Sequence, residues 1–316
     1  MSSSASASTE RVQFECILSN PRSIRNFAAA FSCLYKLGKD VTLEANQATK
    51  TLTLRQVNPA KTSFLAFDFR GEFFEHFTLP HATSTCAKLK LKSCQAVFRA
   101  IKPMERLVLS LVALSNTKHV VMFRSDCRHE VTKTHQFYFE ESEGLDPVFD
   151  RGLTKHRIRV NPKFLLDVLG NIHGPNEIDF VCTAGIQVKI SSVAGSDHPS
   201  APTNTSSQSH HHQQQQQQAQ SLVNTEMLIP MEKFEEFEIS ESTAALTFSI
   251  REWRELLKFC DSSSREVDDL FLLFNDSGMP LMLTSEPVAS HQDDAGLAQF
   301  AFTLVLSTIP ATSAEE

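Results

Sequence analysis

The sequence predicts an α+β protein built from two similar domains, each an antiparallel sheet with two helices on one face. Three observations support this fold class. Each half alternates strand, helix and a run of strands, an order in which helices cover one face of an antiparallel sheet. A strand that runs into a short helix with a basic face occurs twice, at residues 86–102 and 246–260. A Phe-rich phrase precedes both copies, at residues 73–77 and 234–237, which indicates an internal duplication.

Length and composition agree with two domains. The 316 residues exceed what one core usually fills, and 41% of them are hydrophobic. The 24 Phe and only 10 Gly indicate Phe-filled cores and few glycine loops for phosphate binding. The expected organisation is a disordered N-terminus at 1–10, domain 1 at 11–140, a connector at 141–155, domain 2 at 156–309 with a disordered Ser-, His- and Gln-rich insertion at 191–220, and a C-terminal end at 310–316.

The formal net charge of −7 argues against indiscriminate binding to nucleic acid, but the charge is unevenly distributed. The four candidate helices are together net basic, and the rest of the chain is strongly acidic. The seven Cys are odd in number and include no Cys-x-x-Cys pair, which is typical of buried thiols in a reducing compartment. We expect no secretory signal and no membrane span, because residues 1–10 lack a basic head and no segment reaches 18 apolar residues.

The first domain is expected to begin with a strand at 12–18, followed by a helix that Asn20 and Pro21 start and Gly38 ends. The face of this helix opposite its apolar stripe is basic and carries Arg22, Arg25 and Lys36. The helix of the repeated unit has a similar face, which carries Lys92, Arg99 and Lys102. The remaining strands of this domain are expected at 41–45, 51–57, 63–69, 86–91, 106–114, 119–124 and 130–140.

The connector 141–155 contains three large apolar residues, Leu145, Val148 and Phe149, which either pack down on the domains or line a groove. The second domain then restarts with a strand at 156–160 and a helix opened by Asn161 and Pro162, in which Lys163 is accompanied by Asp167. The last helix has three basic residues on one face, Arg251, Arg254 and Lys258. The other strands are expected at 178–182, 185–190, 222–229, 270–274, 281–284 and 299–306.

No local motif for catalysis or cofactor binding is present, so we expect no enzyme and no cofactor. The chain lacks a Gly-x-x-x-x-Gly-Lys phosphate loop, a Gly-x-Gly-x-x-Gly dinucleotide loop, a His-Glu-x-x-His zinc motif and a Gly-x-Ser-x-Gly elbow. Acidic residues at 140–143 and at 268–269 leave a metal-dependent exonuclease as the alternative of another class, although a solvated edge is the simpler interpretation. Three adjacent His at 210–212 lie in a flexible tract without fixed ligand geometry, so no metal site is expected.

Basic helices within an acidic chain favour binding to the phosphate backbone of nucleic acid. Lys and Arg on a smooth helix face contact charge and not base edges, so such binding would be independent of base sequence. If about 3 to 6 phosphates were neutralised, affinity would fall steeply with salt and direct contact alone would be weak. A closed ring around DNA would supply the retention that contact alone does not.

Residues 51–77, TLTLRQVNPAKTSFLAFDFRGEFFEHF, resemble the Rad-nine family of checkpoint clamp subunits, which are relatives of proliferating cell nuclear antigen. The resemblance continues through CAKLKLKSCQAVFRAI, VTKTHQFYF, LDPVFD, TEMLI and FSIREWRELLKF, and it covers most of residues 12–306. It implies two DNA-clamp domains with antiparallel sheets outside and four helices that line a channel around duplex DNA. The first-half motifs resemble the Rad-nine family more than the homotrimeric replication processivity clamp, which stays an alternative function.

The resemblance also implies functional residues by their positions. The DNA-facing residues would be Arg22, Arg25, Lys36, Lys92, Arg99, Lys102, Lys163, Arg251, Arg254 and Lys258. The client groove would be formed by Leu145, Val148, Phe149, Leu306 and Ile309. The subunit edges, where neighbouring subunits pair strands, would contain His119, Val121, Phe123, Leu222, Asn224 and Met227.

Further expectations concern partners. The resemblance implies a heterotrimeric ring with two paralogous clamp subunits, of the Rad-one and Hus-one types, that acts in the nucleus as a platform for DNA-damage checkpoint and repair clients. Because the chain has no ATP site, an ATP-dependent clamp loader would open the ring around double-stranded or primer-junction DNA. Family members continue into a long phosphorylated tail, whereas this sequence stops at Glu316, which leaves tail-dependent recruitment open.

Overall fold

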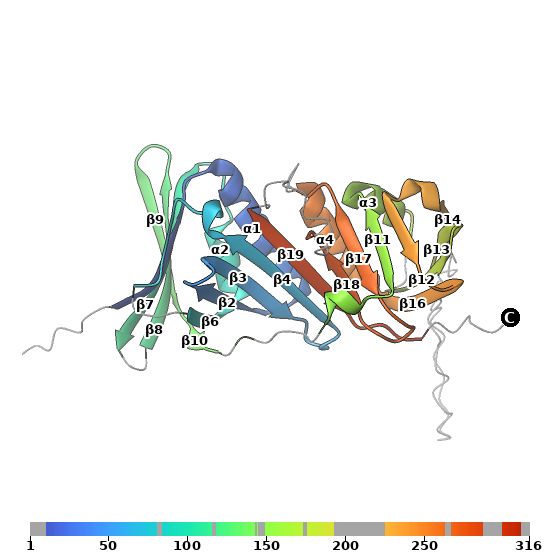
Figure 1. The fold of residues 1–316 in the computed structure, drawn as a ribbon. Coiled ribbons are helices and arrows are strands. Elements are labelled where there is room, and N and C mark those ends of the chain that lie inside the picture. Colours follow the sequence, from blue (N-terminus) through green and yellow to red (C-terminus); the bar gives the residue numbers. More distant parts are fainter. Residues whose placement is uncertain are drawn as a thin grey trace, which may run out of the picture.

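The structure is a computed structural model, and it describes residues 11–80, 84–115, 118–142, 144, 149–172, 176–192, 225–262, 267–286 and 299–310. Within these residues the chain forms three antiparallel sheets and four α-helices (Figure 1). The α+β class predicted from the sequence is therefore confirmed. Three short 3-10 helices, η1 (Gly71–Phe73), η2 (Arg151–Leu153) and η3 (Met231–Lys233), join strands to one another.

The largest sheet has ten strands and runs through both halves of the chain, in the order β10-β6-β2-β3-β4-β19-β18-β17-β11-β15. Its first-half strands are β2 (Asp40–Asn46), β3 (Thr51–Val57), β4 (Ser63–Arg70), β6 (Ser84–Lys90) and β10 (Glu140–Glu141). Its second-half strands are β11 (His156–Val160), β15 (Glu236–Ile239), β17 (Leu270–Phe274), β18 (Leu281–Thr284) and β19 (Phe300–Leu306). Strands β4 and β19 join the two halves in an antiparallel ladder that places Phe67 opposite Phe302.

A smaller sheet stands at each end of the molecule (Figure 1). The five-stranded sheet has the order β5-β1-β7-β8-β9 and consists of β1 (Arg11–Leu18), β5 (His76–Thr78), β7 (Met104–Ser115), β8 (Lys118–Cys127) and β9 (Val131–Tyr138). The four-stranded sheet has the order β14-β13-β12-β16 and consists of β12 (Glu177–Thr183), β13 (Gln187–Ser192), β14 (Glu226–Pro230) and β16 (Thr243–Ser249). Strands β9 and β14 are therefore outermost strands, which present main-chain groups on one side for pairing with another chain.

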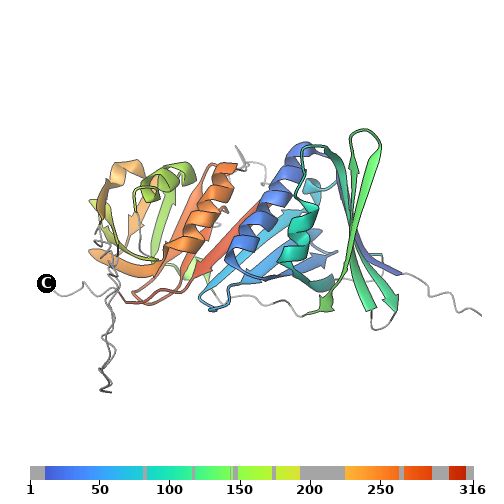
Figure 2. The same cartoon turned by 180° about the vertical axis from the view of Figure 1, so that it is seen from behind.

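The four α-helices lie side by side on one face of the ten-stranded sheet (Figure 2). They are α1 (Pro21–Leu37), α2 (Leu91–Val97), α3 (Pro162–Leu169) and α4 (Ile250–Ser262). Asn20 and Asn161 start α1 and α3 as predicted, because their side-chain oxygens accept the amide hydrogens of Arg22 and Lys163 at 2.9 Å. A Pro follows each Asn, and at the first helical position Pro removes no helical hydrogen bond.

Helix α2 is shorter than predicted, because it ends at Val97 whereas the prediction continued to Lys102. Phe98 leaves the helical conformation, with φ −96° and ψ 10°. Its ring stacks on Phe31 of α1 at a centroid distance of 5.2 Å, so packing against the neighbouring helix ends α2. As a consequence, Arg99 and Lys102 lie in the connection between α2 and β7 and not on the helix.

The main hydrophobic core is filled with Phe rings, as predicted. It extends through both halves as one cluster, whereas the chain length predicted more than one core. Phe67 of β4 and Phe259 of α4 meet across the two halves, with ring centroids 4.7 Å apart. The only Trp of the chain, Trp253 of α4, has no exposed surface. A second, small cluster lies apart from this core and consists of Leu273, Met282 and Val305, with Phe64 and Phe149 packed against it.

All seven cysteines are free thiols, and six of them are buried. Burial raises the pKa of Cys33 and of Cys94 to about 12, so both stay protonated at neutral pH and are poor nucleophiles. Among the described helices, none combines the length and the apolar character that a membrane crossing requires.

Candidate nucleic-acid interface

The exposed side of the four helices, together with the turn after α2, forms one surface that we call the helical wall. Contacts between neighbours give the order α2, α1, α4, α3, which Figure 2 shows. Nine of the ten residues predicted to face DNA are exposed and lie on these helices or in the connection after α2: Arg22, Arg25, Lys36, Lys92, Arg99, Lys102, Lys163, Arg251 and Lys258. The structure thus gathers these residues from four separate segments of the chain, while their contact with DNA stays a prediction.

The first-half end of the helical wall, formed by α1 and α2, carries cations that are available to an external anion. Arg25, Lys92 and Arg99 are exposed, and within the part of the chain that the structure describes none of them forms an ion pair. An exposed cation without a partner in its own chain gives up no ion pair when it meets a phosphate. This end of the wall is therefore the best electrostatic match for a nucleic-acid backbone.

The seam between α1 and α4 contains an acid that the sequence analysis did not single out. The carboxylate of Glu255 on α4 forms two ion pairs, with Lys36 Nζ at 2.8 Å from Oε2 and with Lys258 Nζ at 2.7 Å from Oε1. Burial alone would raise the pKa of Glu255, but hydrogen bonds from Lys258 and Lys36 outweigh it and lower the pKa. The signal was present in the sequence, since Glu255 follows Arg251 by four residues and precedes Lys258 by three, which places all three on one helix face.

The structure contradicts the prediction that Arg254 faces DNA. Its guanidinium donates to the carbonyl oxygen of Leu169 at 2.9 Å and to the carbonyl oxygen of Ile172. These carbonyls lie at and just beyond the C-terminal end of α3, where helical carbonyls lack intrahelical partners and a cation is favoured. Burial lowers the pKa of Arg254, and its side chain joins α4 to α3 and does not project from the wall.

The predicted subunit edge in the first half is also corrected. His119, Val121 and Phe123 lie on β8, which is paired on both sides, with β7 and with β9. The outermost strand next to β8 is β9, whose residues are mostly exposed, including Tyr138 with 72% of its surface accessible. In the second half, Met227 does lie on an outermost strand, β14, and Leu222 and Asn224 fall outside the described residues.

Of the five residues predicted to form the client groove, two are at least partly exposed, one is buried in the core and two lie outside the described residues. Phe149 packs on the small apolar cluster beside Phe64 and Val305, on the sheet face opposite the helices. Leu306 is 1% exposed and belongs to the main core, which corrects its assignment to the groove, because neighbouring residues of a strand point to opposite faces. Ile309 is 53% exposed and its backbone forms a bridge with Thr247. Leu145 and Val148 lie outside the described residues.

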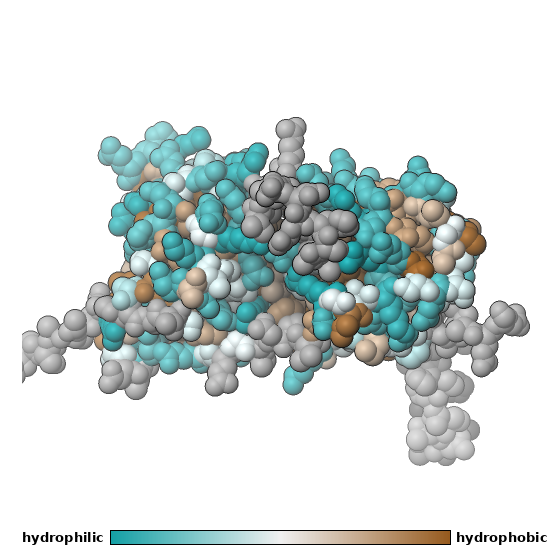
Figure 3. Space-filling view, in the orientation of Figure 1, coloured by the Kyte–Doolittle hydropathy of each residue, from teal (hydrophilic) through white to brown (hydrophobic). Residues whose placement is uncertain are grey.

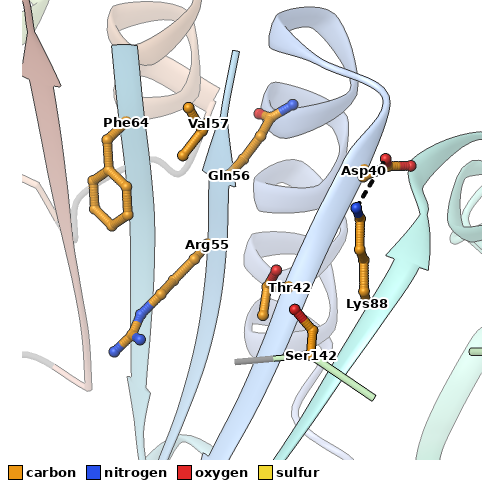
Figure 4. Close-up of a pocket in the computed structure, with 8 residues that line it drawn as sticks. All are labelled: Asp40, Thr42, Arg55, Gln56, Val57, Phe64, Lys88 and Ser142. Atoms are coloured by element: carbon orange, nitrogen blue, oxygen red, sulfur yellow. Dashed lines mark ion pairs between the residues drawn. The ribbon is translucent and has the colours of Figure 1, made fainter. Parts of the chain in front are cut away.

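A pocket adjoins this cluster and was not predicted from the sequence. It has a volume of about 210 Å³ and is lined by Asp40, Thr42, Arg55, Gln56, Val57, Phe64, Lys88 and Ser142 (Figure 4). Lys88 Nζ lies 3.8 Å from Asp40 Oδ2, and Phe64 is shared between the pocket and the apolar cluster. Figure 3 shows that this face of the molecule is otherwise mainly hydrophilic, with separate hydrophobic patches.

The connector between the halves is attached to the sheet at both of its ends. At its start, a Cβ on Gly144 would lie 2.6 Å from both Arg55 Nη1 and Glu44 Oε2, so the backbone passes directly over this ion pair. At its end, Arg151 donates to Glu286 Oε2 at 3.0 Å and to Thr303 Oγ1 at 2.8 Å. These contacts hold the connector against the face that carries the apolar cluster.

The carboxylates considered for a nuclease are not arranged as a metal centre in the part of the chain that the structure describes. Asp269 Oδ2 accepts a hydrogen bond from Arg159 at 2.5 Å, so this carboxylate is already engaged in an ion pair. The described residues contain no group of three or more His, Cys, Asp or Glu placed to hold a metal ion. The His triplet at 210–212 lies outside the described residues.

The sequence of this chain matches a known protein family. A sequence model described as Rad9 matches residues 27–309. The chain is 24% identical over 260 residues to "Cell cycle checkpoint control protein Rad9" of Drosophila melanogaster, which covers 82% of this chain and 51% of the relative. It is 27% identical over 140 residues to "DNA repair protein rad9" of Schizosaccharomyces pombe, which covers 44% of this chain and 30% of that protein. The chain therefore spans about half the length of the first relative, and the match to the second is shorter.

Three solved structures similar to this chain share its fold. PCNA from Thermococcus kodakaraensis superposes with a TM-score of 0.62 at 13% identity, over 93% of this chain and 99% of that one. Proliferating Cellular Nuclear Antigen from Entamoeba histolytica gives a TM-score of 0.63 at 10% identity, over 94% and 99% of the two chains. The PCNA2-PCNA3 complex from Sulfolobus tokodaii gives 0.62 at 14% identity, over 93% and 98%. At these identities the similarity establishes the fold.

Proposed function

We propose that this chain, which belongs to the Rad9 family, is a noncatalytic subunit of a ring-shaped clamp that encircles duplex DNA. The observation that carries the proposal is the helical wall, where exposed cations from four separate segments lie on one side of a continuous sheet. The PCNA-like fold over 93% of the chain supports it. So do the relatives whose names describe cell cycle checkpoint control and DNA repair.

Contact with DNA would run through phosphates and would be independent of base sequence. Arg25, Lys92 and Arg99 present charge from the first-half end of the wall, and Lys163 does so from α3 at the other end. Each neutralised phosphate releases counterions, so affinity falls with salt, with a log-log slope of about −0.9 per contact. A handful of such contacts is weak at physiological salt, and ring closure would keep the protein on DNA where direct contact does not.

Ring closure would use the outermost strands. Strand β9 of this chain and strand β14 each have one side free of a described neighbour, so each can pair with a strand of another subunit. We propose two paralogous clamp subunits, of the Rad-one and Hus-one types, as the partners that complete the heterotrimer. A separate ATP-dependent loader would open the ring, because this sequence contains no nucleotide-binding loop.

The sheet face opposite the helical wall would serve as a platform for checkpoint and repair clients in the nucleus. Phe149 and Phe64 are partly buried apolar residues at the small cluster, and Ile309 is an exposed one. The pocket lined by Asp40 and Lys88 adjoins the cluster at Phe64. Domain 1 would then be residues 11–140 and domain 2 residues 156–309, with the connector 141–155 between them. This arrangement keeps client contacts and DNA contacts on opposite faces of the sheet.

The decisive experiment reverses charge at the first-half end of the wall. In the ring assembled with the two partner subunits, the triple variant R25E, K92E and R99E is expected to weaken binding to a fluorescent 30-base-pair duplex by at least about 10-fold at 100 mM salt. The log-log salt slope, measured by anisotropy, should become less steep by about 2 to 3. The mass of the assembled ring should not change.

A matched control reverses three exposed Lys in connections between strands, K50E, K61E and K233E. This variant changes the net charge equally but leaves the helical wall intact, so its salt slope should match that of the unmodified ring. Equal DNA affinity in the two triple variants would contradict the assignment of the wall. A stable trimer formed by this chain alone would instead favour the homotrimeric replication clamp.

A further inference from the structure

Two lysines of the helical wall share a single carboxylate. Lys36 is on α1 and Lys258 is on α4, and their Nζ atoms lie 2.8 Å and 2.7 Å from different oxygens of Glu255. Each oxygen of the carboxylate thus pairs with one ammonium group, so both oxygens are engaged by the two cations. The three residues together carry one net positive charge, where Lys36 and Lys258 alone would carry two.

The position of Glu255 is fixed by its surroundings. Its side chain is only 14% exposed, whereas those of Lys36 and Lys258 are about half exposed. The backbone around it is also tied across the seam, because Arg251 donates to the carbonyl oxygen of Lys36 at 2.7 Å and the Cys33 thiol approaches the carbonyl oxygen of Glu255 at 3.6 Å. The carboxylate is therefore held at the α1–α4 seam, while the two lysines reach it from the surface.

A phosphate at the seam would have to compete with this carboxylate for both lysines. Moving Lys36 and Lys258 onto DNA would leave Glu255 as a largely buried anion without a partner, which is costly. Arg25, Lys92 and Arg99 face no such competition from any described residue. The cations that are available to DNA phosphates are therefore unevenly distributed along the helical wall.

Building on the proposed function, we propose that Glu255 is a built-in counter-ion that withholds Lys36 and Lys258 from DNA. Strong phosphate contacts are thereby removed from the α1–α4 seam and left to the cations outside it, chiefly Arg25, Lys92 and Arg99 at the first-half end of the helical wall. The middle of the wall stays weakly charged, which lowers the number of phosphates bound at once. A clamp that must move along DNA benefits from such a limit, because each added contact makes release slower.

The test replaces Glu255 with Gln, which keeps the size of the side chain and removes its charge. In the assembled ring, E255Q is expected to bind a 30-base-pair duplex about 3- to 10-fold more tightly at 100 mM salt, with a salt slope steeper by about 1 to 2. The matched control is D261N on the last turn of the same helix, which changes the net charge equally but forms no ion pair with Lys36 or Lys258. Its affinity should change by less than about 2-fold.

A further variant separates release of the lysines from a general change in structure. Adding K36M and K258M to E255Q should remove the whole gain in affinity, because no cation is then released. Equal affinity and equal salt slope for E255Q and the unmodified ring would overturn the inference, as would an equal gain in D261N. If R25E, K92E and R99E also left binding unchanged, the proposed function itself would fail, so the two failures are distinguishable.

Discussion

At the scale of single residues, one buried carboxylate connects the two halves of the molecule. Glu252 of α4 accepts hydrogen bonds from Ser249 Oγ at 2.5 Å and from Asn58 Nδ2 at 3.2 Å. Asn58 in turn accepts the amide hydrogens of Thr62 and Ser63, which shapes the loop between β3 and β4. The first turn of α4 therefore positions a first-half loop that leads directly into the strand carrying Phe64 of the apolar cluster.

Arg254 gives a prediction at the same scale. The variant R254M keeps the aliphatic stem but removes the guanidinium that donates to the Leu169 and Ile172 carbonyls, so we expect the free energy of unfolding to fall by about 2 kcal/mol. Urea unfolding followed by Trp253 fluorescence measures this loss. The exposed control K258M should lose less than about 1 kcal/mol. If R254M were as stable as the unmodified protein and bound DNA as weakly as R25M does, Arg254 would be a DNA-facing residue after all.

At the scale of elements, the helix starts could be predicted from the sequence, whereas the order of the strands within the sheets could not. The Asn-Pro pairs at 20–21 and 161–162 predicted both helix starts, because a cap and a fixed φ act within a few residues. The edge assignment to His119 was wrong because a strand's neighbours depend on the whole sheet, and the alternating pattern of β8 fits an edge or an interior position equally well. The end of α2 depends on a tertiary contact of Phe98.

The groove illustrates a second limit of sequence reasoning. All seven residues of β19 are buried, so no polar alternation indicates which of them faces the helices and which faces the connector. Val305 faces the small cluster and Leu306 faces the core, a choice that only the pairing with β4 and β18 determines. The pair of Glu255 with Lys258, by contrast, could have been found from helix spacing alone, whereas its pair with Lys36 depends on the packing of α1 against α4.

The connector gives a prediction for an element. R151Q removes the ion pair with Glu286 and weakens the bond to Thr303, so local opening of residues 149–153 should become easier. Amide hydrogen exchange of a peptide from this segment should accelerate about 3- to 10-fold, while exchange in β11 is unchanged. R159Q removes an ion pair with Asp269 from the same face, away from the connector, and serves as control. Equal exchange in the connector of both variants would show that Arg151 does not anchor it.

At the scale of the whole molecule, the two halves of the chain form a single folded body. The ladder between β4 and β19 continues the sheet across the halves, and Phe67 and Phe259 fill the space beneath it. Glu255 and Glu252 add polar contacts from α4 to α1 and to the β3–β4 loop. A wall made from both halves keeps a fixed charge pattern only if the halves do not move independently, so this junction is a condition for the proposed DNA contact.

This junction predicts that the two halves unfold together. The sole tryptophan, Trp253, reports on the second half, whereas far-UV circular dichroism reports on both. Because shared core and sheet couple the halves, urea unfolding followed by the two signals should give one coincident transition. The variant F259A, which opens a cavity between Phe67 and Phe302, should lower the midpoint of both signals equally, at a cost of about 3 to 5 kcal/mol. A fluorescence transition that precedes the circular dichroism transition would show that the halves fold separately and that the helical wall can bend at its centre.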